Sequence, residues 1–297
     1  MKNSVLAGVI SAGVMVFTTI SVASETIEQV KAGHVNDNAK ILVKRLQERY
    51  DNTAASCQDS AAAWNCSGLI IRATTVAHPF TPSPTAVKQG AVSFSYIRKD
   101  TVPLTTSYYG PYGIMLKPEF NNLGLSAACI YPVVAVGGTH VPVRHLCSEL
   151  EDEMKSPDDF SSCYSKLGKL PQKTSAAVWV SKFYEKYHHP IDWNTQCSFS
   201  MKDAGQFYAS VKINNIEQSG RGIVNELLIV PWGDEKTDIP SESIETVWYD
   251  VGDKEPTAAC KVAESYAQQL RVKHGVIVYP VGIDFKNGKI IRADCGH

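Results

Sequence analysis

Residues 66–75 have the sequence Cys66-Ser67-Gly68-Leu69-Ile70-Ile71-Arg72-Ala73-Thr74-Thr75. From Gly68 onward the run is apolar and β-branched, which predicts a strand. A guanidinium on such a strand can hold a phosphate or a carboxylate through two parallel hydrogen bonds. An arginine paired with a carboxylate at the sheet edge is the alternative. The stretch therefore predicts a strand that carries Arg72 as a candidate substrate-binding residue.

A second strand is predicted over residues 91–97, where hydroxyl, aromatic and aliphatic residues alternate. Because side chains of a strand point to alternate faces, Ser93 and Ser95 share one face and Phe94 and Tyr96 the other. Hydroxyls on a rigid strand can orient a ligand or a charged side chain. An ordinary strand with a wet polar face is the alternative.

A third strand is predicted over residues 223–230, ending at Pro231. It contains Glu226. Placing a carboxylate in an apolar strand costs free energy unless the group is paired with a cation or has a functional role. Such a group could stabilise an oxocarbenium-like centre, as carboxylates do in sugar-bond cleavage. A solvated glutamate at a strand end is the alternative.

The remaining patterns complete an α+β fold, since short strands and helices are interspersed. Helices are expected over 25–51, 149–154, 175–187, 204–213 and 257–273, and further strands over 113–116, 127–134, 244–249 and 276–283. Cysteines are spread along the whole chain. We therefore expect a single disulfide-stapled domain over residues 24–297.

The first 23 residues are expected to be a signal peptide. Lys2 precedes an uncharged apolar stretch from Val5 to Val22, and Ser21-Val22-Ala23 fits a small-x-small cleavage site. An uncleaved membrane anchor is the alternative. Cleavage would place the protein outside the cell or in the periplasm, with no membrane partner once the leader is removed.

Charge and length exclude several classes of protein. The chain has 297 residues, with 29 Lys+Arg against 30 Asp+Glu and a formal net charge of -1. A domain built to neutralise many phosphates is strongly basic, so nucleic acid is not an expected partner. A polycation that binds surfaces by its overall charge is disfavoured for the same reason.

Eight cysteines behind a leader indicate disulfides rather than a metal site. No CxxC pair with zinc-site spacing occurs, so we expect no metal. Cys57 and Cys66 could close a short loop, and Cys260 and Cys295 could tie the C-terminal tail. The spacing leaves three pairings open for the four others: Cys129, Cys147, Cys163 and Cys197.

Four stretches in the first hundred residues resemble the secreted bacterial halovibrin family. They are Arg49-Tyr50-Asp51-Asn52-Thr53, residues 66–75, Pro82-Ser83-Pro84 and Gly90-Ala91-Val92-Ser93-Phe94-Ser95-Tyr96-Ile97-Arg98-Lys99-Asp100. Later stretches are similar too: Cys129-Ile130-Tyr131-Pro132, Gln196-Cys197-Ser198-Phe199, Asn225-Glu226-Leu227 and Val276-Ile277-Val278-Tyr279-Pro280-Val281. The resemblance is dense over residues 49–100 and sparse elsewhere.

The resemblance implies an exported NAD+ glycohydrolase or ADP-ribosyltransferase, a toxin-type enzyme with an ADP-ribosyltransferase-like split sheet and flanking helices. NAD+ is then the substrate, with no further cofactor, and a protein acceptor is possible. Arg72 looks like the NAD-holding arginine, Ser93 and Ser95 like the serine strand, and Glu226 like the catalytic glutamate. Thr105-Thr106-Ser107 is a rival serine element. Val224 stands where arginine-directed transferases carry a carboxylate, which speaks against transfer to arginine and is compatible with hydrolysis.

Two other readings of the chain stay open. One is an exported, non-catalytic binding or adhesion module, for which the Tyr-rich stretch Ser107-Tyr108-Tyr109-Gly110-Pro111-Tyr112-Gly113 would suit a contact surface. The other is a family member that keeps the scaffold without the activity. An assay for the release of nicotinamide from NAD+ distinguishes both of these from an active enzyme.

Overall fold

The computed structural model describes eight stretches of the chain. These are residues 37–53, 66–75, 79–81, 92–99, 110–131, 199–200, 226–231 and 239–296. The chain divides into two compact units, residues 1–42 and residues 43–297. Of the first unit, only residues 37–42 are described, and they form the beginning of a helix that ends at residue 51. The expected leader, residues 1–23, lies outside the described residues.

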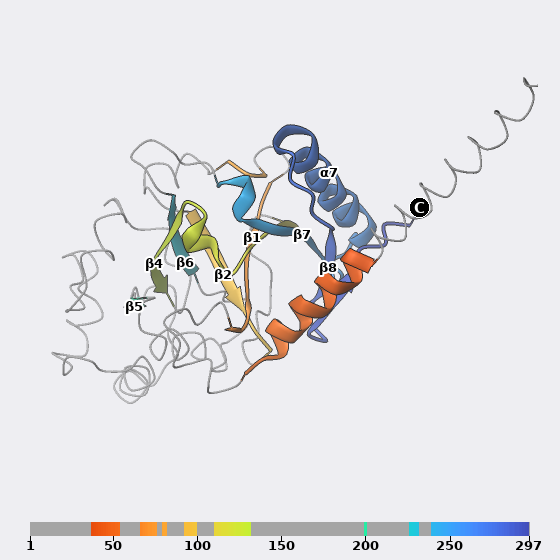
Figure 1. Cartoon of the computed structure of the whole chain (residues 1–297). Helices are drawn as coiled ribbons and strands as arrows, with labels where there is room; N and C mark the ends of the chain where they lie inside the picture. Colours follow the sequence, from red (N-terminus) through yellow and green to blue (C-terminus); the bar gives the residue numbers. More distant parts are fainter. Residues whose placement is uncertain are drawn as a thin grey trace, which may run out of the picture. The chain divides into compact units, whose positions relative to one another are not determined.

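The second unit combines strands with helices (Figure 1). Its strands are β1 (Leu69–Ala73), β2 (Val92–Ile97), β3 (Tyr112–Leu116), β4 (Leu125–Tyr131), β5 (Phe199–Ser200), β6 (Glu226–Pro231), β7 (Ile244–Asp250), β8 (Val281–Asp284) and β9 (Lys289–Arg292). Besides residues 43–51, the helices described in it are α7 (Pro256–His274) and the 3-10 turns η2 (Phe120–Asn122) and η5 (Ser241–Ser243). The expected α+β class is confirmed.

The described strands form a mixed sheet in the order β5-β4-β6-β2-β1-β3-β7-β8-β9. Neighbouring strands are antiparallel except β7 and β8, which are parallel. The parallel pair follows from the crossover through α7, because a parallel connection needs a long return path. Strand β2 joins two parts of the sheet: six strands from β2 to β9, and four strands from β2 to β5.

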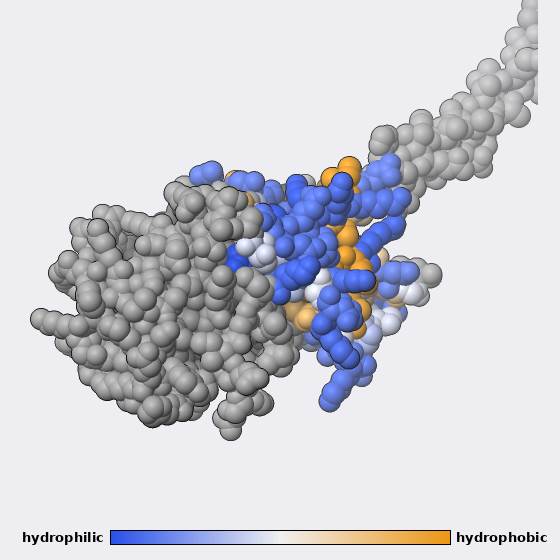
Figure 2. Space-filling view, turned by 90° about the horizontal axis from the view of Figure 1, so that it is seen from below, coloured by the Kyte–Doolittle hydropathy of each residue, from blue (hydrophilic) through white to orange (hydrophobic). Residues whose placement is uncertain are grey.

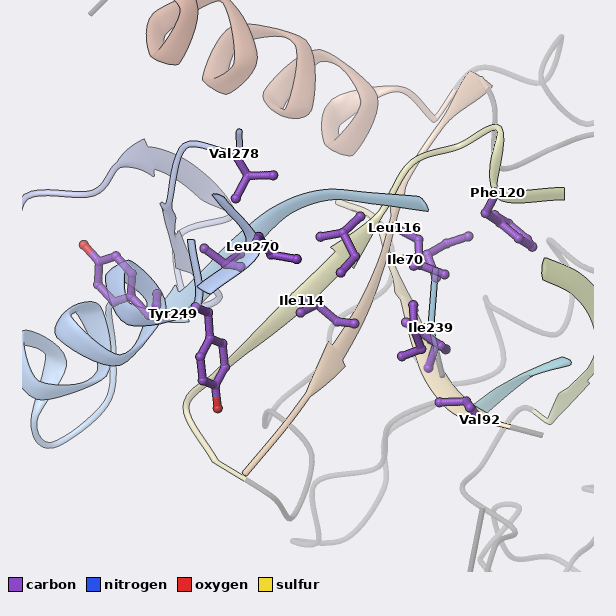
Figure 3. Packing of buried hydrophobic residues seen from close by; sticks show 14 of the residues in the cluster. Ile70, Val92, Ile114, Leu116, Phe120, Ile239, Tyr249, Leu270 and Val278 are labelled. Atoms are coloured by element: carbon purple, nitrogen blue, oxygen red, sulfur yellow. The ribbon is translucent and has the colours of Figure 1, made fainter. Parts of the chain in front are cut away.

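One face of the sheet packs against α7. Every second residue of the central strands enters this core, including Ile70, Phe94 and Ile114, all at most 3% exposed. From α7 the core receives Ala259, Ala263, Tyr266 and Leu270. Figure 3 shows Ile114, Leu116 and Leu270 in this packing. Burial of these apolar side chains is the main force that holds the helix on the sheet.

Residues 43–51 lie on the other side of the strands from α7 (Figures 1 and 3). A buried ion pair fixes this helix to β7: Arg49 Nη1 donates to both carboxylate oxygens of Glu245, at 3.2 and 2.9 Å. Arg45 Nη2 lies 2.8 Å from Oε1 of the same carboxylate. Arg49 also bonds to Gly68 through both its backbone and its side chain, which holds the helix at the start of β1.

Most predicted elements within the described residues are confirmed. The helix expected over 257–273 is α7, and the strands that carry Arg72, Ser95 and Glu226 are β1, β2 and β6. Of the helix expected over 25–51, residues 37–51 are confirmed. The helices expected over 149–154, 175–187 and 204–213 lie outside the described residues.

The strand expected over 276–283 is wrong in its first half, because β8 begins only at Val281. Pro280 has no N–H for a ladder hydrogen bond, although its carbonyl accepts one from Ala293. Strand β9 was not predicted, since Lys289–Arg292 is short and has a charged residue at each end. It forms because the Asn287-Gly288 turn brings it antiparallel to β8.

The predicted disulfide between Cys260 and Cys295 is confirmed, with a Cα–Cα distance of 5.4 Å. It ties the C-terminal tail to α7. Cys66 is also disulfide-bonded, and none of the described cysteines is free. Its expected partner, Cys57, lies outside the described residues, as do Cys147, Cys163 and Cys197.

One face of the described part of the protein is mainly polar. Figure 2 shows one face, on which hydrophilic residues predominate and hydrophobic residues are few. Among the helices that the structure describes, none combines the length and the apolar character needed to cross a membrane.

Candidate functional site

Arg72 lies in the middle of the sheet, on β1, where the residues on either side of it are buried. Its Cα partner on β3 is Ile114, whose partner on β7 is Val247. Both partners belong to the core under α7, so Arg72 stands on the α7 face. Arg72 is half-buried, and its Nη1 atom is inaccessible to solvent. The guanidinium is therefore held within the packing of the second unit.

The close approach of β3 to β1 depends on Gly113. A Cβ atom on Gly113 would lie 1.8 Å from the backbone carbonyl oxygen of Arg72. No side chain fits there, so glycine is required by space rather than by its backbone angles. The Gly residue in a predicted strand is the one sequence signal that could have indicated this contact.

Ser93 and Ser95 lie on β2, which pairs with β1 on one side and β6 on the other. Both are half-buried, whereas Phe94 and Tyr96 are each 1% exposed in the core. The predicted alternation of hydroxyls on one face and rings on the other is confirmed. Ser95 is the Cα partner of Ile71, so the serines stand on the face opposite α7.

Glu226 is the first residue of β6, and its Cα partner on β4 is Tyr131. The next residue, Leu227, pairs with Phe94 and is fully buried in the core. Alternation therefore places position 226 on the other face from Leu227, which is the face of Ser95. The same register, continued by one residue, sets position 226 beside Ser95.

The fold thus brings the three candidate strands together as neighbours, in the order β6-β2-β1. It places Ser93, Ser95 and position 226 on one face and Arg72 on the other. A sequence pattern shows alternation within each strand, but it does not show which faces of different strands coincide. That relation depends on the register between strands, which forms only in the folded sheet.

On the α7 face, the end of β1 meets a cluster of hydroxyl and aromatic groups. Tyr266 accepts a hydrogen bond from Thr74 Oγ1 at 3.2 Å and donates one to the carbonyl of Thr75 at 2.8 Å. The rings of Phe80 and Tyr112 contact Tyr266 edge to face, at 5.8 and 5.9 Å. Sequence analysis predicted a helix over residues 257–273 but assigned no role to Tyr266.

Burial of the Tyr266 phenol raises its pKa from 10.0 to about 12, although the hydrogen bond from Thr74 opposes the rise. Desolvation penalises the phenolate, because the core offers no water to solvate the charge. Tyr266 is therefore neutral at physiological pH and acts as a hydrogen-bonding link between α7 and β1. It is not placed to act as a base.

Other sequence candidates lie outside the described residues, namely Thr105-Thr106-Ser107 and Val224. In the part of the chain that the structure describes, His, Cys, Asp and Glu residues form no group of three or more that could hold a metal ion.

Comparison with known proteins adds no family for this chain. No protein-family model matches the sequence, and no curated protein matches it.

Proposed function

We propose that this protein is an exported enzyme that cleaves the nicotinamide–ribose bond of NAD+, with water as the acceptor of ADP-ribose and a protein acceptor as the possible variant. The observation that carries the proposal is the strand order β6-β2-β1. It makes neighbours of the three strands to which the halovibrin resemblance assigns the glutamate, the serines and the arginine.

In this proposal Glu226 is the catalytic residue. The bond between nicotinamide and ribose C1′ breaks, and nicotinamide leaves with the bonding electrons. The carboxylate of Glu226 stabilises the positive charge that develops on the ribose, and water then attacks C1′ and releases a proton. A preorganised carboxylate of this kind contributes several kcal/mol to lowering the barrier. Ser93 and Ser95 orient the carboxylate and the ribose from the neighbouring strand. The resemblance assigns the substrate's phosphates to Arg72, although Arg72 stands on the opposite face of the sheet.

The proposal includes the finer fold, an ADP-ribosyltransferase-like split sheet. Its support is that β2 belongs both to the six-stranded part and to the four-stranded part of the sheet. Export is also part of the proposal. Its support is the leader-like sequence of residues 1–23 and the paired state of Cys66, Cys260 and Cys295, since disulfides persist in oxidising compartments.

One observation favours a second candidate function, an exported binding module without catalysis. Arg72 stands on the α7 face, whereas Ser95 stands on the opposite face. A single dinucleotide contacts both only if it reaches around the sheet or if another serine element serves the site. In a binding module, Arg72 is a structural residue of the core and Glu226 is an ordinary strand residue.

The test is the release of nicotinamide from NAD+ by the purified, oxidised protein, measured by chromatography. Release without an added protein supports the glycohydrolase, and release only with an acceptor protein supports the transferase. No release from a correctly folded protein rejects the enzyme and leaves the binding module.

Two variants locate the chemistry. Glu226→Gln keeps the size of the side chain and removes its charge, so we expect turnover to fall at least a hundredfold while NAD+ binding, measured by calorimetry, persists. Glu242→Gln is the matched control, because Glu242 is exposed on η5 and has no proposed role. Full activity of the Glu226→Gln protein would reject the assigned role.

A further inference from the structure

The C-terminal end of α7 forms a corner with exposed aliphatic side chains. The helix stops at Gly275, which has φ 68° and donates its N–H to the carbonyls of Leu270 and Arg271. On either side of this glycine, Val272 is 75% exposed and Ile277 is 64% exposed. Figure 1 shows this end of α7 at the upper edge of the view.

The exposure of these two side chains is unusual for this protein. Among the residues that the structure describes, four large hydrophobic side chains are exposed: Ile41, Val272, Ile277 and Ile291. Two of the four lie within six positions of each other. Each leaves most of an aliphatic side chain in water. The protein therefore lacks the stabilising free energy that burial of this apolar area would contribute.

The same corner carries the positive charges of Arg271 and Lys273. Arg271, Lys273 and His274 occupy the last turn of α7, and all three are exposed. No aspartate or glutamate occurs in the sequence between Glu264 and Asp284. Cations at a helix C-terminus interact favourably with the helix dipole, which accounts for part of this pattern. The dipole gives no reason for Val272 and Ile277 to project into solvent.

We propose that this corner, formed by Arg271, Val272, Lys273, His274 and Ile277, binds the surface of a bilayer that contains anionic phospholipids. The basic groups would meet the lipid phosphates, and the two aliphatic side chains would enter the boundary between headgroups and acyl chains. The inference is independent of the proposed enzymatic function.

A bilayer fits this corner better than a protein partner does. A stable protein–protein interface buries at least about 1,000 Å² and needs a complementary pocket for each anchor. The corner offers two aliphatic side chains that project from a helix end. A fluid bilayer buries such projecting side chains without needing a matching shape, and its anionic surface attracts the clustered cations.

Sequence analysis predicted no membrane partner after removal of the leader, and the net charge disfavoured a polycation that binds surfaces. That expectation averages over all 297 residues and is insensitive to local clustering. Surface attraction acts within a Debye length, about 10 Å at 0.1 M salt, so the local group decides it. The corner therefore binds peripherally, and no part of it spans the bilayer.

The experiment is co-sedimentation of the full-length protein with vesicles. One set contains equal parts of phosphatidylglycerol and phosphatidylcholine, and the other contains phosphatidylcholine alone. We expect binding to the anionic vesicles only, weakened by salt. Arg271→Gln/Lys273→Gln should lower this binding about thirtyfold, and Val272→Ser/Ile277→Ser about tenfold or more.

The matched control is Ile291→Ser, which removes an exposed aliphatic side chain from β9 without changing the charge. It should bind as the parent protein does. All variants carry the same residues 1–23, so any binding by that apolar segment is the same in each of them. Binding to the phosphatidylcholine vesicles measures it and is subtracted. Melting temperatures verify that each variant is folded.

Three outcomes would overturn the proposal. They are equal binding to both vesicle sets, an Ile291→Ser loss as large as that of the corner variants, and binding to soluble polyglutamate in place of vesicles. The last result would identify an acidic macromolecule as the partner.

Discussion

Arg72 and Ser95 lie on adjacent strands of the sheet, yet they stand on opposite faces. Ile71 and Ser95 are Cα partners on the two strands. Arg72 therefore lies opposite Phe94 and shares its face, whereas Ser95 shares the face of Ile71. Phe94 belongs to the core under α7, whereas Ser95 is half-buried on the other face. This relationship separates the arginine from the serines, which the halovibrin resemblance places in one site.

The face relationship predicts which pairs of candidate residues are energetically coupled. Ser95→Ala and Glu226→Gln should be non-additive, because their positions are neighbours on one face. Ser95→Ala and Arg72→Gln should be additive to within about 0.5 kcal/mol, because the sheet separates their side chains. Urea unfolding of the single and double variants measures both cycles and does not require activity. Strong coupling between Ser95 and Arg72 would contradict the register.

Glu245 should be critical for stability. Its side chain is 2% exposed and bonds with Arg45 and Arg49, so Glu245→Gln leaves the buried Arg49 guanidinium without its counter-charge. Breaking a buried pair from one side costs about 3–5 kcal/mol. Urea unfolding should show a loss of that size. Glu242→Gln, at an exposed position, should change the free energy of unfolding by no more than about 0.5 kcal/mol.

The Cys260–Cys295 disulfide should stabilise the protein chiefly by restricting the unfolded chain. The two cysteines are 35 positions apart. A loop of this size corresponds to about 3–4 kcal/mol in the chain-entropy model. The double variant Cys260→Ala/Cys295→Ala should unfold at correspondingly lower urea. Both residues are at most 2% exposed, so mild reductant should leave the bridge intact in the folded protein. Rapid reduction under native conditions would show that the tail opens readily.

Tyr266 should make stability fall at alkaline pH. Its folded pKa, about 12, is above the unfolded value of 10.0, so the unfolded chain loses the proton first. The stability due to the neutral phenol is fully present below pH 10 and is lost as the pH rises towards 12. Two pKa units correspond to about 3 kcal/mol.

Tyr266→Phe isolates this contribution. The variant loses the hydrogen bonds with Thr74 and Thr75, so its stability at pH 7 should fall by about 1–2 kcal/mol. Its alkaline slope should be smaller than that of the parent protein. Identical slopes above pH 10 would mean that another group, such as Tyr249, whose pKa burial also raises, carries the effect.

Local sequence patterns predicted a helix or strand well where the residues of that element alone determine its structure. The strand at Leu69–Ala73 is apolar and β-branched, and α7 buries Tyr266 and Leu270 at helical spacing. The alternation of Ser95 with Tyr96 followed from the two-residue period of a strand. Strand β9 was not predicted, because its own sequence gives little signal and its pairing with β8 stabilises it.

The sequence by itself determined the α+β class and the division of each strand into two faces, because these depend on residues close together or on a simple period. It offered the pairing of Cys260 with Cys295 as one possibility, which the structure confirmed. Only the tertiary structure decided that Arg72 and Ser95 face opposite ways, that Glu245 binds two arginines about 200 positions earlier, and that Gly113 admits the backbone of Arg72. These relations depend on the register between strands and on which distant surfaces bury one another, and a linear pattern contains neither.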